Sequence, residues 1–558
     1  MTKTTGNFTD FVSFSRASGG TALRRISYGN ELVTNGTFDT GISGWTAFLS
    51  TISWVSGKIR VQASTTGISA RVADQLMTGL TVGKVYHLVG SVVAQNNFGA
   101  SNGNASLSIR NTANSLTIAS SALPNNTLGD ISLSFVATET SQIVRLRWDG
   151  DVATTDASFD YDNISVKEVL FDRADGTLQL FNHPTNVPRV EYDASGNRKG
   201  LLIEEARTNL LLRSEDVSNA SWIKGGGVTV GTPVQVAGIS LDNIINIGTS
   251  NFRSIWQPFG AVANGGTVTF SCYIKSGTAP ETAIRIDDVG TGATSNRVTV
   301  PINWAGGVPT LGTPVLLGLT HVGANISLVD STGVYRVSLT VQNNTGASLN
   351  LFAVYYVTWD GPIAAEDTYA GGFQTEVGAF PTSYIPTSGA TATRAADICS
   401  IATSAFGYNQ KAGTIVVDVA EFKFGTSGYP RAFELGNSSY SDDRINVVVE
   451  AASGNYSVGL YTASSFQMGG ALVSSISSPF FPRKAALAYK TNDGASAYDG
   501  GIKATDATID VSGTTYPRNT LKIGGGTTSA TAQINGHIKS IRYYPRRLSN
   551  AQIQALTA

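Results

Sequence analysis

Charged residues are scarce in this chain. They make up only 14% of its 558 residues, and the formal net charge is −1. A protein that binds nucleic acid along its surface needs a basic face, so this balance excludes broad electrostatic binding of DNA or RNA. Local basic spots, such as Arg546 and Arg547, stay open.

Cysteine and histidine are scarcer still, with two and four copies. Cys272 lies in an alternating run, FSCYIK, where we expect a small buried apolar residue rather than half of a disulfide. Because the chain has no CxxC pair and no Cys/His cluster, a zinc site is not expected. The histidines are scattered and no serine stands in a G-x-S-x-G turn, so a Ser-His-Asp hydrolase has no local support.

Long apolar runs are also missing. No stretch approaches the ~18 residues needed to cross a membrane. The first residues, MTKTTGNFTDFVSFSRAS, lack the apolar core of a signal peptide. We therefore expect no membrane span and no secretion signal, a combination that fits an extracellular protein released by lysis.

The residues that are present favour strands. The chain has 60 glycines, and Val, Ile, Thr and Tyr recur in short runs between Gly, Asn and Asp turns, whereas helix-forming residues rarely occur at helical spacing. The length suffices for about three or four domains. The expected fold class is all-β.

Two segments have distinctive sequences: GLLIEEARTNLLLRSED at Gly200–Asp216 and FQTEVGAFPTSYIPTSGATATRAAD at Phe373–Asp397. Together they resemble a family of tailed-phage and prophage virion proteins, the tail fibres, spikes and head fibres. In that family a GLLIEE-x-RTNLL segment begins a β-sandwich and an FPTSYIPT segment ends it. The resemblance covers roughly residues 171–397 and implies a virion component rather than a cellular enzyme.

The stretch before it has the landmarks of another sandwich. It begins with NGTFD at Asn35–Asp39 and Gly44-Trp45, and ends with FDYDNISV at Phe159–Val166. This pair resembles the jelly-roll carbohydrate-binding modules. Asp216 precedes Trp222 by the same spacing that separates Asp39 from Trp45, which indicates an internal duplication of one sandwich.

The C-terminal part resembles a third kind of sandwich. GHIKSIRYY at Gly536–Tyr544 runs into PRRLS, where Ser549 is expected to cap a short helix. This ending resembles the concanavalin-like or laminin-G-like lectin sandwich. The expected domains are therefore a virion-anchoring segment at 1–30, a carbohydrate-binding-module-like jelly roll at 31–168, a second jelly roll with the GLLIEE and FPTSYIPT framework at 169–397, and a laminin-G-like sandwich at 398–558.

Catalysis is not expected. Glu204 and Glu205 are adjacent and cannot flank one glycosidic bond from a strand, so a structural role is favoured, with Arg207 as one partner. The C-terminal part also lacks the E-x-D-x-x-E run found in glycosidases of the same fold.

Aromatic side chains near amide and charged groups are better functional candidates, because flat rings stack on sugars while polar groups bind hydroxyls. The alternative for Trp148, as for Trp45 and Phe135, is a place in the core. The loops around Tyr429 and Phe466 are further alternatives in the third sandwich. The candidate sugar-binding residues are Trp54, Gln95, Asn97, Phe98, Trp148, Tyr440 and Tyr461.

No cofactor is required by this sequence. A structural calcium ion is a further hypothesis, since the terminal strands of jelly-roll binding modules often share one. Asp39 and Asp162 would supply its carboxylates.

The resemblance implies attachment of a virion to host-surface glycans by a protein at the virion surface, anchored to other virion proteins by its N-terminal segment and assembled as a homotrimer. A purely architectural connector that binds no sugar remains an alternative. A polysaccharide depolymerase is the second alternative.

Overall fold

Alternating apolar and polar residues form β-strands throughout most of the chain. The computed structural model describes residues 12–97, 103–123, 127–152, 154–248, 253–288, 296–358, 364–424, 428–437, 443–481, 484–511, 516–526 and 532–558. Within these residues, helix is confined to a 3₁₀ turn, η1 (Thr403–Phe406), and to α2 (Asn550–Thr557). The prediction of an all-β fold is confirmed. The chain divides into two units, one of residues 25–177 and a larger one of residues 1–24 and 178–558.

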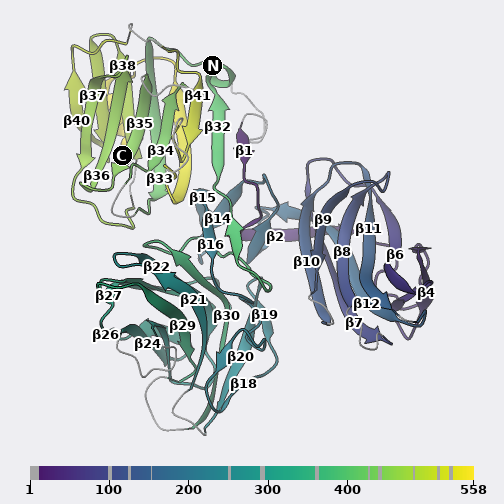
Figure 1. Ribbon diagram of the computed structural model, residues 1–558. Coiled ribbons are helices and arrows are strands. Elements are labelled where there is room, and N and C mark those ends of the chain that lie inside the picture. Colours follow the sequence, from purple (N-terminus) through teal and green to yellow (C-terminus); the bar gives the residue numbers. More distant parts are fainter. Residues whose placement is uncertain are drawn as a thin grey trace. The chain divides into compact units, whose positions relative to one another are not determined.

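Residues 25–177 form a sandwich of two antiparallel sheets (Figure 1). One sheet has the order β4 (Ser50–Trp54), β5 (Ile59–Ala63), β12 (Ser158–Phe171), β7 (Val85–Asn96) and β10 (Gly129–Val136), and β2 (Gly20–Glu31) pairs with β12 from Ile26 onward. The other sheet has the order β3 (Thr46–Phe48), β6 (Gly67–Thr78), β11 (Ser141–Val152), β8 (Gly103–Asn111) and β9 (Thr117–Ala122). Large rings fill the core between them, among them those of Phe38, Trp45, Trp148 and Phe159.

The larger unit contains a second sandwich. Its first sheet has the order β18 (Val228–Val230), β20 (Ile239–Ile247), β30 (Ala365–Val377), β22 (Thr267–Lys275), β28 (Tyr335–Gln342) and β27 (Thr320–Leu328), with β19 (Val234–Val236) beside β20. Its second sheet has the order β17 (Ile223–Lys224), β21 (Ser254–Val262), β29 (Leu349–Tyr356), β23 (Glu281–Asp287), β24 (Arg297–Ala305) and β25 (Val308–Leu311), with β26 (Val315–Leu317) also beside β24. Cys272 lies buried in this core as a free cysteine, as predicted.

The two sandwiches share one strand order. In the first, β5, β12, β7 and β10 lie side by side, and in the second β20, β30, β22 and β28 do so in the same chain sequence. The facing sheets correspond as well, with β6, β11, β8 and β9 matched by β21, β29, β23 and β24. Phe159 in β12 and Phe373 in β30 are both fully buried, each in the core of its own sandwich. The prediction of two related sandwiches is therefore supported by the strand order, independently of the few residues that their sequences share.

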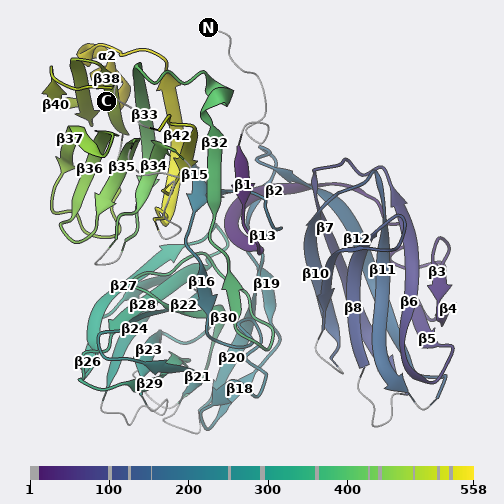
Figure 2. The ribbon, with the colours of Figure 1, turned by 45° about the horizontal axis from the view of Figure 1, so that its top comes forward.

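A third sandwich follows in the same unit. One sheet has the order β1 (Ser13–Ser15), β32 (Ile398–Ala402), β41 (Thr520–Ile523), β34 (Arg431–Gly436), β35 (Arg444–Glu450), β36 (Asn455–Thr462) and β37 (Ser465–Val473). The other has the order β14 (Arg189–Tyr192), β15 (Arg198–Ile203), β42 (Gly536–Tyr544), β33 (Ala412–Glu421), β38 (Lys484–Lys490), β39 (Asp493–Tyr498) and β40 (Gly501–Asp506). Figure 2 shows α2 beside β38 of this sheet.

Helix α2 begins where the sequence predicts. The Ser549 hydroxyl accepts the backbone N–H of Gln552 at 3.3 Å, and the Gln552 side chain accepts the Ser549 N–H at 2.9 Å. This reciprocal pair satisfies two N–H groups that an uncapped helix would leave free. Ile553 and Leu556 then pack on the apolar outer side of the sheet.

The GLLIEE segment corrects one expectation. Residues 198–203 form β15, which pairs with β42 of the third sandwich instead of beginning the second, and Leu201 and Ile203 belong to the third core. Gly200 makes this pairing possible. Its φ is +129°, and a side chain there would come within 2.4 Å of the carbonyl oxygen of Ile538. The GLLIEE segment is therefore part of the third sandwich at β15.

The N-terminal segment is also more ordered than expected. Residues 1–11 lie outside the described part of the chain, but β1 and β2 are strands of the sheets. Of the segment 1–30 that we expected to anchor the protein, residues 13–30 thus serve mainly as sheet strands.

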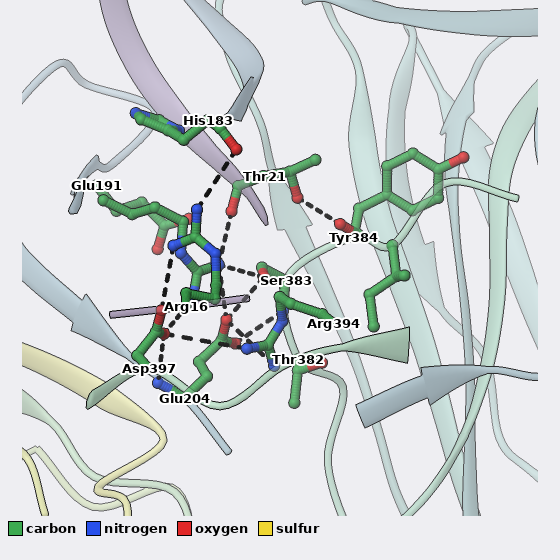
Figure 3. A network of polar contacts seen from close by, with 12 residues as sticks. Arg16, Thr21, His183, Glu191, Glu204, Thr382, Ser383, Tyr384, Arg394 and Asp397 are labelled. Carbon is green, nitrogen blue, oxygen red and sulfur yellow. Dashed lines mark hydrogen bonds and ion pairs between the residues drawn. The ribbon is translucent and has the colours of Figure 1, made fainter. Parts of the chain in front are cut away.

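Buried charges tie distant segments of the larger unit together (Figure 3). Arg16, Arg189 and Arg394 surround the carboxylates of Glu204 and Asp397, and all five side chains are buried. Glu204 also accepts the backbone N–H of Ser383 at 2.8 Å. This framework joins the turn after β1, strand β14, the GLLIEE segment and the FPTSYIPT segment.

The structural role predicted for both glutamates holds. Glu204 lies inside the charge framework, and the neighbouring Glu205 accepts the Arg207 Nε–H at 2.6 Å. The two residues follow the end of β15 rather than continuing it.

Candidate functional site

Strand β11 presents polar side chains on the face of its sheet that points away from the core. Val144, Leu146 and Trp148 are fully buried within the core. Side chains alternate between the two faces of a strand, so Arg145, Arg147 and Asp149 lie on the opposite, outer face. We call this surface the β11 face. Its members come from β3, β6, β8, β11 and the turn after β8: Phe48, Asp74, Leu76, Ser106, Ser108, Arg110, Asn114, Arg145, Arg147 and Asp149.

A central ion pair organises the β11 face. Arg145 donates to both carboxylate oxygens of Asp74, at 2.8 and 2.6 Å, and donates again to the Asn114 Oδ1 at 2.9 Å. Arg110 donates to the same Asn114 side chain and to the Thr117 hydroxyl at 2.7 Å. Two-pronged pairs of this kind hold both partners in one orientation. The network therefore presents fixed amide, hydroxyl and guanidinium groups.

A second ion pair lies further along β11. Arg147 donates to both oxygens of Asp149 at 2.8 Å, and these side chains are 39% and 42% exposed. The hydrogen bond with Asp149 raises the pKa of Arg147. Burial, in contrast, lowers the pKa of Arg110, helped by the nearby charge on Arg145. Neither shift removes the charge of Arg147 or Arg110 at neutral pH.

Apolar side chains flank the polar groups. Strand pairing places Phe48, Val72, Arg147 and Ser106 in one row across the sheet, and Leu76, Ile143 and Arg110 in another. The Asp74, Arg145 and Ser108 row lies between these two. Phe48 is 60% exposed and Leu76 is 58% exposed. Rows of one face repeat about every 7 Å along the strands, so the rows of Phe48 and Leu76 lie about 13 Å apart, with the polar row of Asp74 between them.

The structure corrects the expectation for Trp148. Its ring is fully buried, its Nε1–H donates to the Val61 carbonyl at 2.7 Å, and the Arg71 guanidinium lies 4.6 Å from the ring centre. A ring in this position cannot stack on a sugar, and the alternative of a core residue holds. Trp45 and Phe135 are core residues as well. The candidate functional groups are the neighbours of Trp148 on β11, whose side chains point to the opposite face.

The other residues predicted in this sandwich lie apart from the β11 face. Trp54 is half exposed in β4, on the other sheet, and its Nε1–H donates to the Phe38 carbonyl at 2.6 Å. Gln95 pairs with Phe159 near the end of β7, and Asn97 is exposed just beyond it with a φ of +57°. Phe98 lies outside the described residues.

In the third sandwich, Tyr461 belongs to a small cluster at the outer side of β36. Arg444 lies 3.9 Å from the centre of its ring, and the exposed ring of Phe466 meets it edge-on at 5.4 Å. Tyr440 falls outside the described residues. Tyr429 is also exposed, but the ring contacts of this cluster involve only Arg444, Tyr461 and Phe466 among the described residues.

The two aspartates proposed for calcium are in separate local contacts. Asp39 accepts the Thr37 hydroxyl at 2.7 Å, and Asp162 accepts the backbone N–H of Asn163 at 2.7 Å. Among the described residues, no group of three or more His, Cys, Asp or Glu side chains is arranged to hold a metal ion. The calcium site stays a prediction.

The fold defines an all-β protein built from β-sandwiches, and its described helices include none that is long and apolar enough to span a membrane. No protein-family model and no curated protein matches the chain.

Solved structures with local similarity are carbohydrate-binding modules. The CBM40 of a Ruminococcus gnavus sialidase is 19% identical and aligns 27% of this chain with 84% of its own, at a TM-score of 0.23. A CBM4 structure is 14% identical over 24% of this chain and 99% of its own, at a TM-score of 0.19. The CBM22 tandem domain of Paenibacillus barcinonensis Xyn10C is 10% identical over 63% of this chain and 98% of its own, at 0.20. These values assign neither a family nor a ligand to this chain.

Proposed function

We propose that the β11 face binds glycans on a host surface and that the chain is a virion-surface protein of a tailed phage, a tail fibre, spike or head fibre. The resemblance of the GLLIEE and FPTSYIPT motifs to those of phage virion proteins supports the phage assignment. The chemistry of the β11 face supports glycan binding. The single observation that carries this proposal is the polar stretch between the exposed side chains of Phe48 and Leu76.

The chemistry of this face suits a sugar. A pyranose has C–H faces that pack on flat or apolar side chains, and hydroxyls that bind fixed donors and acceptors. Phe48 and Leu76 offer the first kind of contact. Asp74, Asn114 and Arg147 offer the second, and because ion pairs already orient them, binding requires little further ordering.

The same ion pairs favour binding over cleavage. A glycosidase needs one carboxyl group whose pKa is raised so that it can donate a proton. Asp74 and Asp149 each accept two hydrogen bonds from an arginine, so the oxygens that a proton donor would present to a substrate are already occupied. We therefore propose a binding protein without hydrolytic activity.

The partners follow from this role. Residues before β1 would contact other virion proteins, and three copies of the chain would form a homotrimer. Several weak sugar sites on one particle would then act together, which strengthens attachment without tighter single contacts. A calcium ion at Asp39 and Asp162 would add only local stiffness.

Binding of the full-length chain to a glycan array and to host polysaccharide tests the proposal. Phe48→Ala and Arg147→Ala should each weaken binding at least about tenfold, as expected for loss of a stacking or charged contact. Val82→Ala and Lys84→Ala remove exposed side chains from the turn between β6 and β7, away from the β11 face, and should leave binding unchanged.

Other outcomes are equally informative. Binding that survives both face variants would place the sugar elsewhere. A wild-type chain that binds neither glycans nor host cells would favour the architectural connector, and new reducing ends in the polysaccharide would identify a depolymerase.

A further inference from the structure

One side of the second sandwich exposes aliphatic side chains. They belong to the edge strands β25, β26 and β27, and we call them the apolar edge: Val308, Val315, Leu316, Leu317, Val322 and Leu328. Each is between 43% and 54% exposed. Strands β25 and β26 both contact β27, so the side chains come from adjoining strands. Single exposed aliphatic residues are ordinary, but a group from three adjoining strands marks a contact surface.

The sequence around this edge contains no charge. From Val298 to Val329 there is no Asp, Glu, Lys or Arg, and the nearest charges are Arg297 and Asp330. The edge strands therefore offer no charge of their own to a charged partner, although Arg297 of β24 pairs with Leu317 and Arg336 of β28 pairs with Ser327. A mainly apolar partner surface suits this edge.

Position within the sheets points the same way. β27 is the last strand of its sheet, and β25 and β26 each pair only with β24 among the described strands. Edge strands of proteins that stay single are commonly guarded by lysine or proline. Pro309 and Pro314 lie in and beside β25 and β26, whereas β27 has neither proline nor a charged residue. β27 has a bulge between His321 and Gly323, which is one guard of a free edge, but it lacks the two others.

The chemistry of the edge does not suit a glycan. Its exposed members are all aliphatic, with no exposed ring to stack on a sugar face. A second copy of the chain is the simplest match, because apolar strands that carry no charge of their own can gather around a symmetry axis without charge repulsion between them.

We infer that the apolar edge is the surface through which copies of this chain associate. This inference rests on the proposed function for the presence of a homotrimer, while the surface itself comes from the exposed side chains. It assigns the contact to the second sandwich, whereas the β11 face belongs to the first.

Sedimentation of the full-length chain over a range of concentrations tests it. The wild type should associate, and Leu316→Lys combined with Val322→Lys should weaken association at least tenfold. Because both side chains are half exposed, these changes should leave the fold intact, as circular dichroism will verify. Leu128→Lys, a matched exposed leucine on the first sandwich, is the control and should associate like the wild type.

Three results would overturn the inference. The first is a wild-type chain that is monomeric at every concentration, and the second is an edge variant that associates as strongly as the wild type. The third is a wild-type chain that associates only when another virion protein is added. Sugar affinity, measured on the same variants under monomeric conditions, reports on the β11 face separately. Failure of glycan binding would leave the association result standing.

Discussion

Arg16 and Asp397 form a buried ion pair at 3.1 Å across 381 residues of sequence. Burial, with the nearby charge of Arg189, lowers the pKa of Arg16 to about 10, so the guanidinium still carries its charge at neutral pH. Asp397 also accepts hydrogen bonds from Arg189 and from the backbone N–H of Glu204. One carboxylate thus joins the turn after β1, strand β14 and the GLLIEE segment.

Removal of that carboxylate charge should destabilise the larger unit strongly. Asp397→Asn keeps the shape but leaves three buried arginines facing the single carboxylate of Glu204. We expect a loss of about 3–5 kcal/mol in the free energy of unfolding, as for other broken buried pairs. Calorimetry and urea unfolding should show this loss, whereas Asp175→Asn, at an exposed site, should change stability by less than about 0.5 kcal/mol. An Asp397→Asn protein as stable as the wild type would contradict this role.

Acid should weaken the larger unit through Glu191. Burial opposes ionisation of this residue, but the charge on Lys199 and the hydrogen bond with His537 outweigh it and lower the pKa to about 2. Because the folded pKa is depressed, the stabilisation is present above the usual pKa near 4.3 and is lost as the pH falls toward 2. The loss attributable to Glu191 is at most about 3 kcal/mol.

Unfolding free energies measured between pH 7 and 2 test this dependence. Glu191→Gln should flatten the acid part of the curve, while Asp175→Asn, at an exposed carboxylate, should leave the curve parallel to that of the wild type. A Glu191→Gln curve with unchanged acid slope would exclude the assignment.

Asp242 should act in the opposite direction. Burial raises its pKa to about 6, although its carboxylate accepts the Val217 N–H at 2.7 Å. With a raised folded pKa, the residue destabilises the fold progressively as the pH rises from its usual pKa near 4 through 6. Asp242→Asn keeps an oxygen for the Val217 N–H and should therefore stabilise the protein at pH 7.5 by about 1–3 kcal/mol. The gain should vanish below pH 4, and a gain of equal size at both pH values would refute this explanation.

The sequence predicts the sandwiches well because each depends on local information. Alternating runs such as Val144–Trp148 determine which side chains enter a core, and the shared Asp–Trp spacing indicates the duplication that the strand order supports. The pairing of β15 with β42 could not be predicted in this way, since it joins residues 201 and 538. The same holds for the charge framework, whose arginines look like ordinary surface residues in the sequence.

The sequence pointed to the strand that carries the candidate site, but not to the residues of the site. Trp148 drew attention to β11, and the same alternation that buries Trp148 directs Arg147 and Asp149 outward, so the pattern could have identified them. Asp74 and Asn114 could not be found, because they reach the site from a strand and a turn that only the sheet brings next to Arg145.

Neighbouring residues of β11 should separate stability from binding. Trp148→Leu removes a buried ring that packs at 5.8 Å against Phe159, and it removes the donor to the Val61 carbonyl, so we expect a loss of about 3 kcal/mol or more in stability. Since its side chain points inward, the folded variant should bind glycan with nearly wild-type affinity. Arg147→Ala should do the reverse, with stability changed by less than about 1 kcal/mol because its ion pair is exposed, but with weakened glycan binding. Thermal unfolding and glycan titration of both variants at 15 °C, where the less stable one remains folded, distinguish the two roles. If both substitutions weakened binding equally, the ring of Trp148 would contribute to the site after all.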